Sequence, residues 1–248
     1  MPAREKRLSA DSVILKEDRP PLDIEFRSGE IVGLAGLDGH GQDAFMEVLA
    51  GWTKPVSGSV SLFGEKDRLH IRGFAHAMRH GVAYLPRDRR KTGIFPALSI
   101  LDNFAIASIG GDTRFGFISG RSRRQRYEKF KALLSIVADD PKAAIPTLSG
   151  GNQQKVLLAR LLVREPAVLL LNDPTRGVDV ATRRLLYKVF RELAAEGMTI
   201  VTLSTEIEEA IFLCDRVLVF RDNALSAELS GDGLTNDHVI AAMFGQIS

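Results

Sequence analysis

Two stretches of sequence decide the fold of this chain: Leu148-Ser-Gly-Gly-Asn-Gln-Gln-Lys155 and, one helix later, Val168-Leu-Leu-Leu-Asn-Asp-Pro-Thr175. The first places a serine and two glycines at the start of an expected helix, where free backbone N–H groups and the helix dipole form a site for an anion. The second is an apolar strand that brings polar residues to its carboxyl end, where open α/β sheets bind their ligands. Together they predict an α/β protein that handles a phosphate group.

A third motif lies upstream and has the required strand, glycine loop and helix in order. The strand Glu30-Ile-Val-Gly-Leu-Ala35 runs into Gly36-Leu-Asp-Gly-His-Gly-Gln-Asp43, and the apolar-periodic helix Ala44-Phe-Met-Glu-Val-Leu-Ala50 follows. This context is typical of a phosphate-binding P-loop. With all three motifs in place, nearly the whole chain resembles the ATPase subunits of ABC transporters.

Within these ATPases, three stretches most resemble the second nucleotide-binding domain of sugar-type importers. They are Gly150-Gly-Asn-Gln-Gln-Lys155, Pro174-Thr-Arg-Gly-Val-Asp179 and Pro86-Arg-Asp-Arg-Arg-Lys91. Such importers usually carry two nucleotide-binding domains in tandem, and this chain is long enough for one. The resemblance implies an α/β P-loop NTPase fold with a RecA-like core, an antiparallel β edge and an inserted helical subdomain.

The composition favours a soluble globular protein. A net charge of +2 over 248 residues is too small to indicate nucleic acid as a partner. Cys214 is the one cysteine, so no intrachain disulfide forms and a reducing compartment fits. No apolar run has transmembrane length, and no apolar segment of a signal peptide follows Met1–Arg7. We therefore expect a cytoplasmic protein that reaches the inner face of the membrane through permease subunits.

The pattern along the chain predicts two regions. By resemblance, residues 1–86 and 147–248 form the nucleotide-binding core with an N-terminal β subdomain, and residues 87–146 form the helical subdomain. An antiparallel pair is expected beside the P-loop strand. The expected strands are Ser12–Leu15, Leu22–Phe26, Ser59–Phe63, Val82–Leu85, Val168–Leu171, Thr199–Leu203, Val217–Phe220 and Ala224–Leu229. The expected helices are Ile71–His80, Ile100–Ile109, Arg121–Ala138, Thr182–Ala195 and Asn236–Phe244.

The P-loop lacks its usual side chains. An intact loop ends in Gly-Lys-Ser/Thr, because the lysine bridges the β- and γ-phosphates and the hydroxyl binds Mg²⁺. Here those positions are Gln42 and Asp43. Each unit charge about 4 Å from a phosphate changes the interaction energy by up to about 4 kcal/mol, so a large loss of ATP affinity is expected. The expected nucleotide-binding positions are Gly36, Leu37, Asp38, Gly39, His40, Gly41, Gln42 and Asp43.

The catalytic positions implied by the resemblance are also altered. The aspartate that holds Mg²⁺ aligns with Asn172, and the glutamate that activates water aligns with the shorter Asp173. A base must reach its proton within about 2.6–3.2 Å or act through a water. The glutamine-loop position aligns with Arg87 and the switch histidine with Thr205, while no aromatic residue precedes Phe26 to stack on adenine.

Two interpretations of this site remain open. In one, Asp43 binds Mg²⁺ directly and makes up for the negative charge that is missing at Asn172. Arg87, Arg89 or Arg90 then provides the positive charge of the missing lysine. In the other, which we favour, the loop is vestigial and binds nucleotide weakly or not at all.

The signature is intact at Ser149, Gly150, Gly151 and Gln153. In ABC dimers each ATP lies between the P-loop of one domain and the signature of the other. The resemblance therefore implies the degenerate half of an asymmetric ATPase pair, which provides its signature in trans to a partner's Mg-ATP. The implied partners are a second nucleotide-binding domain, transmembrane permease subunits and, indirectly, a solute-binding protein. The alternatives are a self-sufficient slow ATPase and a non-transport ATPase of the same type.

Overall fold

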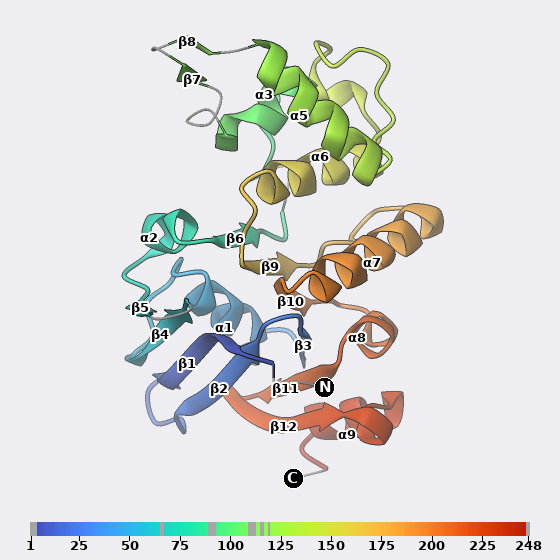
Figure 1. Cartoon of the computed structure of the whole chain (residues 1–248). Helices are drawn as coiled ribbons and strands as arrows, with labels where there is room; N and C mark the ends of the chain where they lie inside the picture. The colour runs from blue at the N-terminus through green and yellow to red at the C-terminus, as the bar shows by residue number, and fades with distance from the viewer. Residues whose placement is uncertain are drawn as a thin grey trace. The chain divides into compact units, whose positions relative to one another are not determined.

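The computed structural model describes residues 4–64, 67–88, 93–108, 113–114, 117–118 and 120–246. The chain forms two compact units, coloured along the chain in Figure 1. Unit 1 comprises Met1–Tyr84, Ala167–Pro174 and Phe190–Ser248, and unit 2 comprises Leu85–Pro166 and Thr175–Val189. Of the four boundaries between the units, one falls within the strand Val82–Leu85 and one within the helix Val180–Ala195.

Unit 1 holds two sheets. The antiparallel sheet has the order β2 (Leu22–Arg27), β1 (Lys6–Ile14), β4 (Ser57–Phe63) and β5 (Arg68–His70). The larger sheet has the order β12 (Ala224–Ser230), β11 (Arg216–Arg221), β3 (Ile31–Gly36), β10 (Thr199–Leu203), β9 (Val168–Asn172) and β6 (Val82–Leu85). In it, β11, β3, β10 and β9 are parallel, and β12 pairs antiparallel with β11.

The position expected for the antiparallel pair is wrong. β1 and β2 do pair, but in a sheet of their own, and the neighbours of β3 are β11 and β10. The burial patterns explain the difference. Residues of β2 alternate between buried and exposed, as in a sheet with one solvated face, whereas Ile31–Ala35 of β3 are all buried, as in a parallel sheet covered on both faces.

The core of unit 1 lies around α1 (Gln42–Leu49), which packs between the two sheets (Figure 1). The ring of Phe45 lies 6.4 Å from that of Phe26 on β2 and 5.1 Å from that of Phe220 on β11. Gly33 of β3 faces α8, because a Cβ there would lie 3.5 Å from the Cβ of Ala210 on that helix. The other helical segments are α2 (Phe74–Arg79), α8 (Ile207–Leu213), the 3-10 turn Gly231–Gly233 and α9 (Asn236–Met243).

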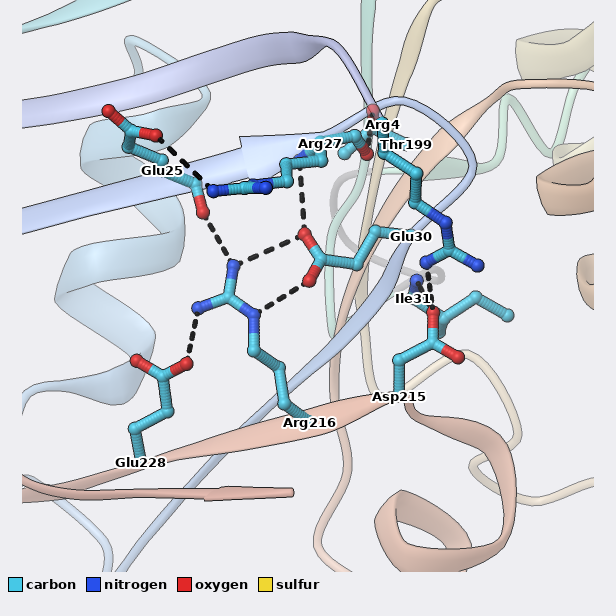
Figure 2. Close-up of polar contacts among 9 residues, drawn as sticks. All are labelled: Arg4, Glu25, Arg27, Glu30, Ile31, Thr199, Asp215, Arg216 and Glu228. Atoms are coloured by element: carbon cyan, nitrogen blue, oxygen red, sulfur yellow. Dashed lines mark hydrogen bonds and ion pairs between the residues drawn. The ribbon is translucent and has the colours of Figure 1, made fainter. Parts of the chain in front are cut away.

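A buried ion pair joins the strands at the amino end of β3 (Figure 2). Arg216 Nε lies 2.7 Å from Glu30 Oε1, and both side chains are largely buried. Arg216 also bonds Glu228 at 3.0 Å and the carbonyl of Glu25. Burial lowers the pKa of Arg216, but the hydrogen bond and charge of Glu30 outweigh it and keep that pKa above its ordinary value. Removing one partner of this pair would leave the other charge buried and unpaired, which is destabilising.

Unit 2 is mostly helical. Its elements are α3 (Ile100–Ala105), the 3-10 turn Ile106–Ser108, β7 (Thr113–Arg114), β8 (Phe117–Ile118), α5 (Gly120–Leu133), the 3-10 turn Ile145–Thr147, α6 (Gly150–Leu162) and the first part of α7 (Val180–Ala195). Phe104 packs edge-on against Tyr127 at 5.5 Å, and burial raises the pKa of Tyr127 to about 12. Helix α5 ends five residues before the expected Ala138, because Ser135 takes a left-handed φ of 48°.

Among the described residues, no helix is long and apolar enough to cross a membrane.

Candidate functional site

The glycine loop, Gly36–Asp43, connects β3 to α1 in unit 1. Gly39 and Gly41 have φ of +79° and +111°, which side-chain-bearing residues rarely adopt. A Cβ on Gly41 would lie 2.8 Å from the Cα of Asn223, so this glycine also permits a close backbone contact. The backbone thus has the tight turn and the helix start that suit a phosphate.

The side chain of Gln42 is buried and turned onto the loop itself. Its Nε2 donates to the carbonyl oxygens of Leu37, at 2.8 Å, and Gly36, at 3.3 Å. Its Oε1 is buried and has no hydrogen-bond partner among the described residues. The amide donors at the position of the usual lysine are therefore used within the loop.

Asp43 lies beside the end of strand β9. Its Oδ1 accepts a hydrogen bond from Asn172 Nδ2 at 3.2 Å. The Oδ1 of Asn172 is buried and, within the described part of the chain, has no hydrogen-bond partner. The pKa of nearby Tyr84 is raised to about 12: burial raises it most, the charges of Glu47 and Asp43 raise it too, and a hydrogen bond with Asn172 lowers it. The structure thus brings together two positions at which the resemblance predicts metal ligands.

The remaining candidate positions are divided between the units. Asp173 follows β9 with a left-handed φ of 54°, and its backbone N–H donates to the carbonyl of Leu203 at 2.7 Å. Thr205 is exposed and follows the neighbouring strand β10. Arg87 belongs to unit 2. Arg89 and Arg90 lie outside the described residues.

The turn between β11 and β12 contacts the glycine loop, which sequence reasoning missed. The Asp222 N–H donates to His40 Nδ1 at 3.1 Å, and the Asn223 N–H donates to the carbonyl of His40 at 2.8 Å. Asp222 and Asn223 both have positive φ, at 51° and 62°. An Asp-Asn pair between two alternating strands is a signal for such a hairpin turn, although it does not say what the turn contacts. His40 therefore supports the loop.

The signature forms the start of α6 in unit 2. Ser149 is exposed and caps the helix through its side chain. Gln153 Nε2 donates to the carbonyl of Leu148 at 3.0 Å. A Cβ on Gly151 would lie 3.5 Å from Thr182 Oγ1, an ordinary contact, so Gly151 is less crowded than Gly41.

The curated relatives are named as sugar-import ATP-binding proteins, and each is about twice this length. The chain is 38% identical over 224 residues to ribose import ATP-binding protein RbsA 2 of Rubrobacter xylanophilus, covering 90% of the chain and 43% of that protein. It is 36% identical over 247 residues to a putative ribose/galactose/methyl galactoside import ATP-binding protein of Geobacillus kaustophilus, covering 100% and 49%. The chain thus spans about half the length of the curated relatives it matches.

Solved structures confirm the expected fold. A dimeric bacterial ABC transporter cassette superposes with a TM-score of 0.76 at 21% identity, covering 90% of this chain and 98% of that one. A nucleotide-free ATP-binding cassette from an ABC transporter gives a TM-score of 0.80 at 16% identity, covering 98% and 99%. The profile of the ABC transporter family matches residues 20–176, well over half of the sequence, and this chain therefore belongs to the ABC transporter family.

Proposed function

We propose that this chain is an ATP-binding domain of an ABC importer for a monosaccharide or similar small solute, and that it is the degenerate half of an asymmetric ATPase pair. The names of the relatives from Rubrobacter and Geobacillus support a sugar as the solute. The partners are a second, competent nucleotide-binding domain and permease subunits that hold the pair at the cytoplasmic face of the membrane. A solute-binding protein completes the importer.

One observation carries this proposal: the altered side chains of the glycine loop are engaged with their own unit, while Ser149 at the start of α6 is exposed. Gln42 is bonded to the loop carbonyls and Asp43 to Asn172. Ser149 caps its helix, and of the two glycines that follow it Gly150 is partly exposed and Gly151 is buried.

The residues around the glycine loop fit Mg-ATP poorly. Mg²⁺ prefers an octahedral shell of oxygens and is usually held by carboxylates together with substrate phosphates. Asp43 and the amide Asn172 offer one carboxylate, and among the described residues no cluster of three or more His, Cys, Asp or Glu could hold a metal. Without a lysine, Asp43 repels the phosphates that the loop backbone would otherwise accept. No catalytic step is therefore assigned to this loop.

In the assembled pair, the signature acts on ATP held by the partner domain. The Ser149 hydroxyl and the backbone N–H groups of Gly150 and Gly151 are donors for a phosphate at the start of α6. Preorganised donors of this kind stabilise charge that develops in the transition state. Closure of the pair around ATP then moves the permease subunits.

The experiment compares two variants of this chain in the reconstituted transporter. Gly150→Asp places a carboxylate against the partner's phosphate and is expected to abolish ATP hydrolysis. Gln42→Ala removes no charge and is expected to change hydrolysis little. Equal damage from both variants, measured as phosphate release, would contradict the division of labour.

The contact between Asp43 and Asn172 also favours a second candidate, a self-sufficient slow ATPase with a rearranged magnesium site. The variant Asp43→Ser separates the two. If Asp43 binds the metal, the change weakens magnesium-dependent nucleotide binding by the isolated chain. If Asp43 only repels phosphate, the change improves binding. Equilibrium dialysis with labelled ATP, together with phosphate release by the unaltered chain, gives the answer.

A further inference from the structure

We propose that Asn152 is a positioning residue that turns the hydroxyl proton of Ser149 outward, toward the phosphate that the signature receives. The inference rests on the proposed function, in which Ser149 serves an ATP molecule bound by the partner domain. Asn152 lies in the first turn of α6 and follows the two signature glycines.

The hydrogen bonds to Ser149 fix the direction of its proton. Ser149 Oγ accepts from the side-chain Nδ2 of Asn152 at 3.1 Å and from the backbone N–H of the same residue at 3.4 Å. A hydroxyl has two acceptor positions and one proton to donate. With both acceptor positions occupied, the proton points away from Asn152. Within the described part of the chain, it meets no acceptor.

A second contact fixes the orientation of the Asn152 amide itself. The backbone N–H of Val137 donates to Asn152 Oδ1 at 2.8 Å. A backbone N–H can only donate, so the side-chain oxygen must face Val137 and the Nδ2 group must face Ser149. The three groups form one directed series, from the Val137 N–H through Asn152 to the Ser149 hydroxyl. An outward hydroxyl proton suits an anionic acceptor and does not suit a cation.

Lys155 provides a matched control, because it anchors the same segment without touching Ser149. Its side chain is buried, and its Nζ donates to the carbonyl of Ser135, two residues before Val137. Loss of either side chain loosens the connection between α5 and α6. Only loss of Asn152 also frees the serine hydroxyl to rotate.

The test measures ATP hydrolysis by the reconstituted transporter for Asn152→Leu, Ser149→Ala, the double variant and Lys155→Met. Ser149→Ala removes a phosphate donor and is expected to lower kcat/KM by about 100-fold. Asn152→Leu is expected to lower it about tenfold, because the donor remains but is no longer oriented. The double variant should match Ser149→Ala alone, since Asn152 acts through the serine. Lys155→Met should leave kcat/KM within about twofold of the unaltered chain.

The variant Asn152→Asp guards against a trivial loss of folding. Its shape is unchanged, and it still accepts from the Val137 N–H, but its second oxygen now takes the proton of Ser149. It should keep the thermal unfolding temperature while losing at least as much activity as Asn152→Leu.

Two outcomes would overturn the role of Asn152 and leave the proposed function standing. One is that the losses of kcat/KM add up in the double variant, and the other is that Lys155→Met lowers kcat/KM as much as Asn152→Leu does. A transporter indifferent to both Ser149→Ala and Gly150→Asp instead overturns the proposed function, and the role of Asn152 with it.

Discussion

The glycine loop and the signature each precede a helix start, the kind of place where phosphates bind, yet their polar side chains are engaged differently. In the loop, Gln42 donates to its own backbone and Asp43 pairs with Asn172. At α6, Gln153 and Asn152 satisfy local groups, while Ser149 stays exposed. Under the proposed function, the loop has the phosphate-binding backbone without the usual charges, whereas the signature has both its backbone and its donor.

The two regions also differ in how closely the chain packs around their glycines. Gly41 lies against the Asn223 backbone, and a Cβ on Gly36 would lie 2.6 Å from Gln42 Oε1. Gly151 has ordinary contact distances to its neighbours. The glycine loop is thus packed more closely against the rest of its unit than the start of α6 is at Gly151.

The largest effect is expected from restoring the lost side chains. The triple variant Gln42→Lys, Asp43→Thr, Asn172→Asp returns a positive charge, a hydroxyl and a metal-binding carboxylate to an intact backbone. Since each charge matters by up to about 4 kcal/mol near a phosphate, affinity of the isolated chain for Mg-ATP should rise by about 100-fold or more. Equilibrium dialysis measures it. Gln42→Lys alone is the control, and it should gain less because Asp43 remains. No gain in the triple variant would mean that the backbone has lost its phosphate-binding shape.

The next effect concerns the backbone of the loop. Gly41→Ala must place a Cβ 2.8 Å from Asn223 Cα at a φ of +111°, and it should lower the free energy of unfolding by about 2–3 kcal/mol. Gly39→Ala is the matched control, because its φ is also positive but no atom lies within 4 Å of the added Cβ. It should cost about 1 kcal/mol. Urea unfolding compares them, and equal losses would show that the turn between β11 and β12 does not brace the loop.

Much of the fold was predictable because its signals are local. The strand, glycine loop and helix around Gly36–Asp43 occur in the expected order, and so do the buried strands β9 and β10. Strand β1 was expected from Ser12 but begins at Lys6. Ser12 has a φ of 49° where the pairing register shifts, so the alternation restarts at this irregularity and hides the first half of the strand.

The side-chain contacts of the site were less predictable, because they join residues far apart in the sequence. The identities of Gln42 and Asp43 already predicted a loss of positive charge, and that of Asn172 predicted the loss of a metal-binding carboxylate. They did not predict that Asp43 and Asn172 would bond each other, 129 residues apart, or that His40 would accept from Asp222, 182 residues away. The role of Asn152 was not predicted for a different reason. Its side chain accepts from the backbone N–H of Val137, and every residue except proline has such a group, so no sequence pattern identifies the contact.

A smaller effect is expected at the pair of Asp43 and Asn172. Asn172→Asp sets two carboxylates within hydrogen-bond distance, which raises the pKa of one of them. A raised pKa in the folded state means that stability is lost as the pH rises through that value and returns on acidification. Unfolding by urea should show a loss of about 1–2 kcal/mol at neutral pH and less at about pH 5. The swap Asp43→Asn with Asn172→Asp is the control, because it keeps one carboxylate and one amide and should recover most of the stability.

The smallest effect is expected next to the signature, where Asp179 caps the start of α7. The Thr182 N–H donates to Asp179 Oδ1 at 2.9 Å, and the Thr182 hydroxyl donates to Oδ2 at 2.8 Å. These bonds, the backbone bond first, hold the pKa of Asp179 below its ordinary value. A lowered pKa stabilises the fold above the unfolded value near 3.9, and this contribution disappears as the pH falls through the folded value. Asp179→Asn still caps the helix, so the thermal unfolding temperature at neutral pH should change little. The decrease in stability on acidification should become smaller. Thr182→Val should shrink it too, by removing one of the two donors. If both variants kept the acid dependence of the unaltered chain, the Asp179 carboxylate would not be the group that titrates. The start of α7 would then not depend on the charge of Asp179.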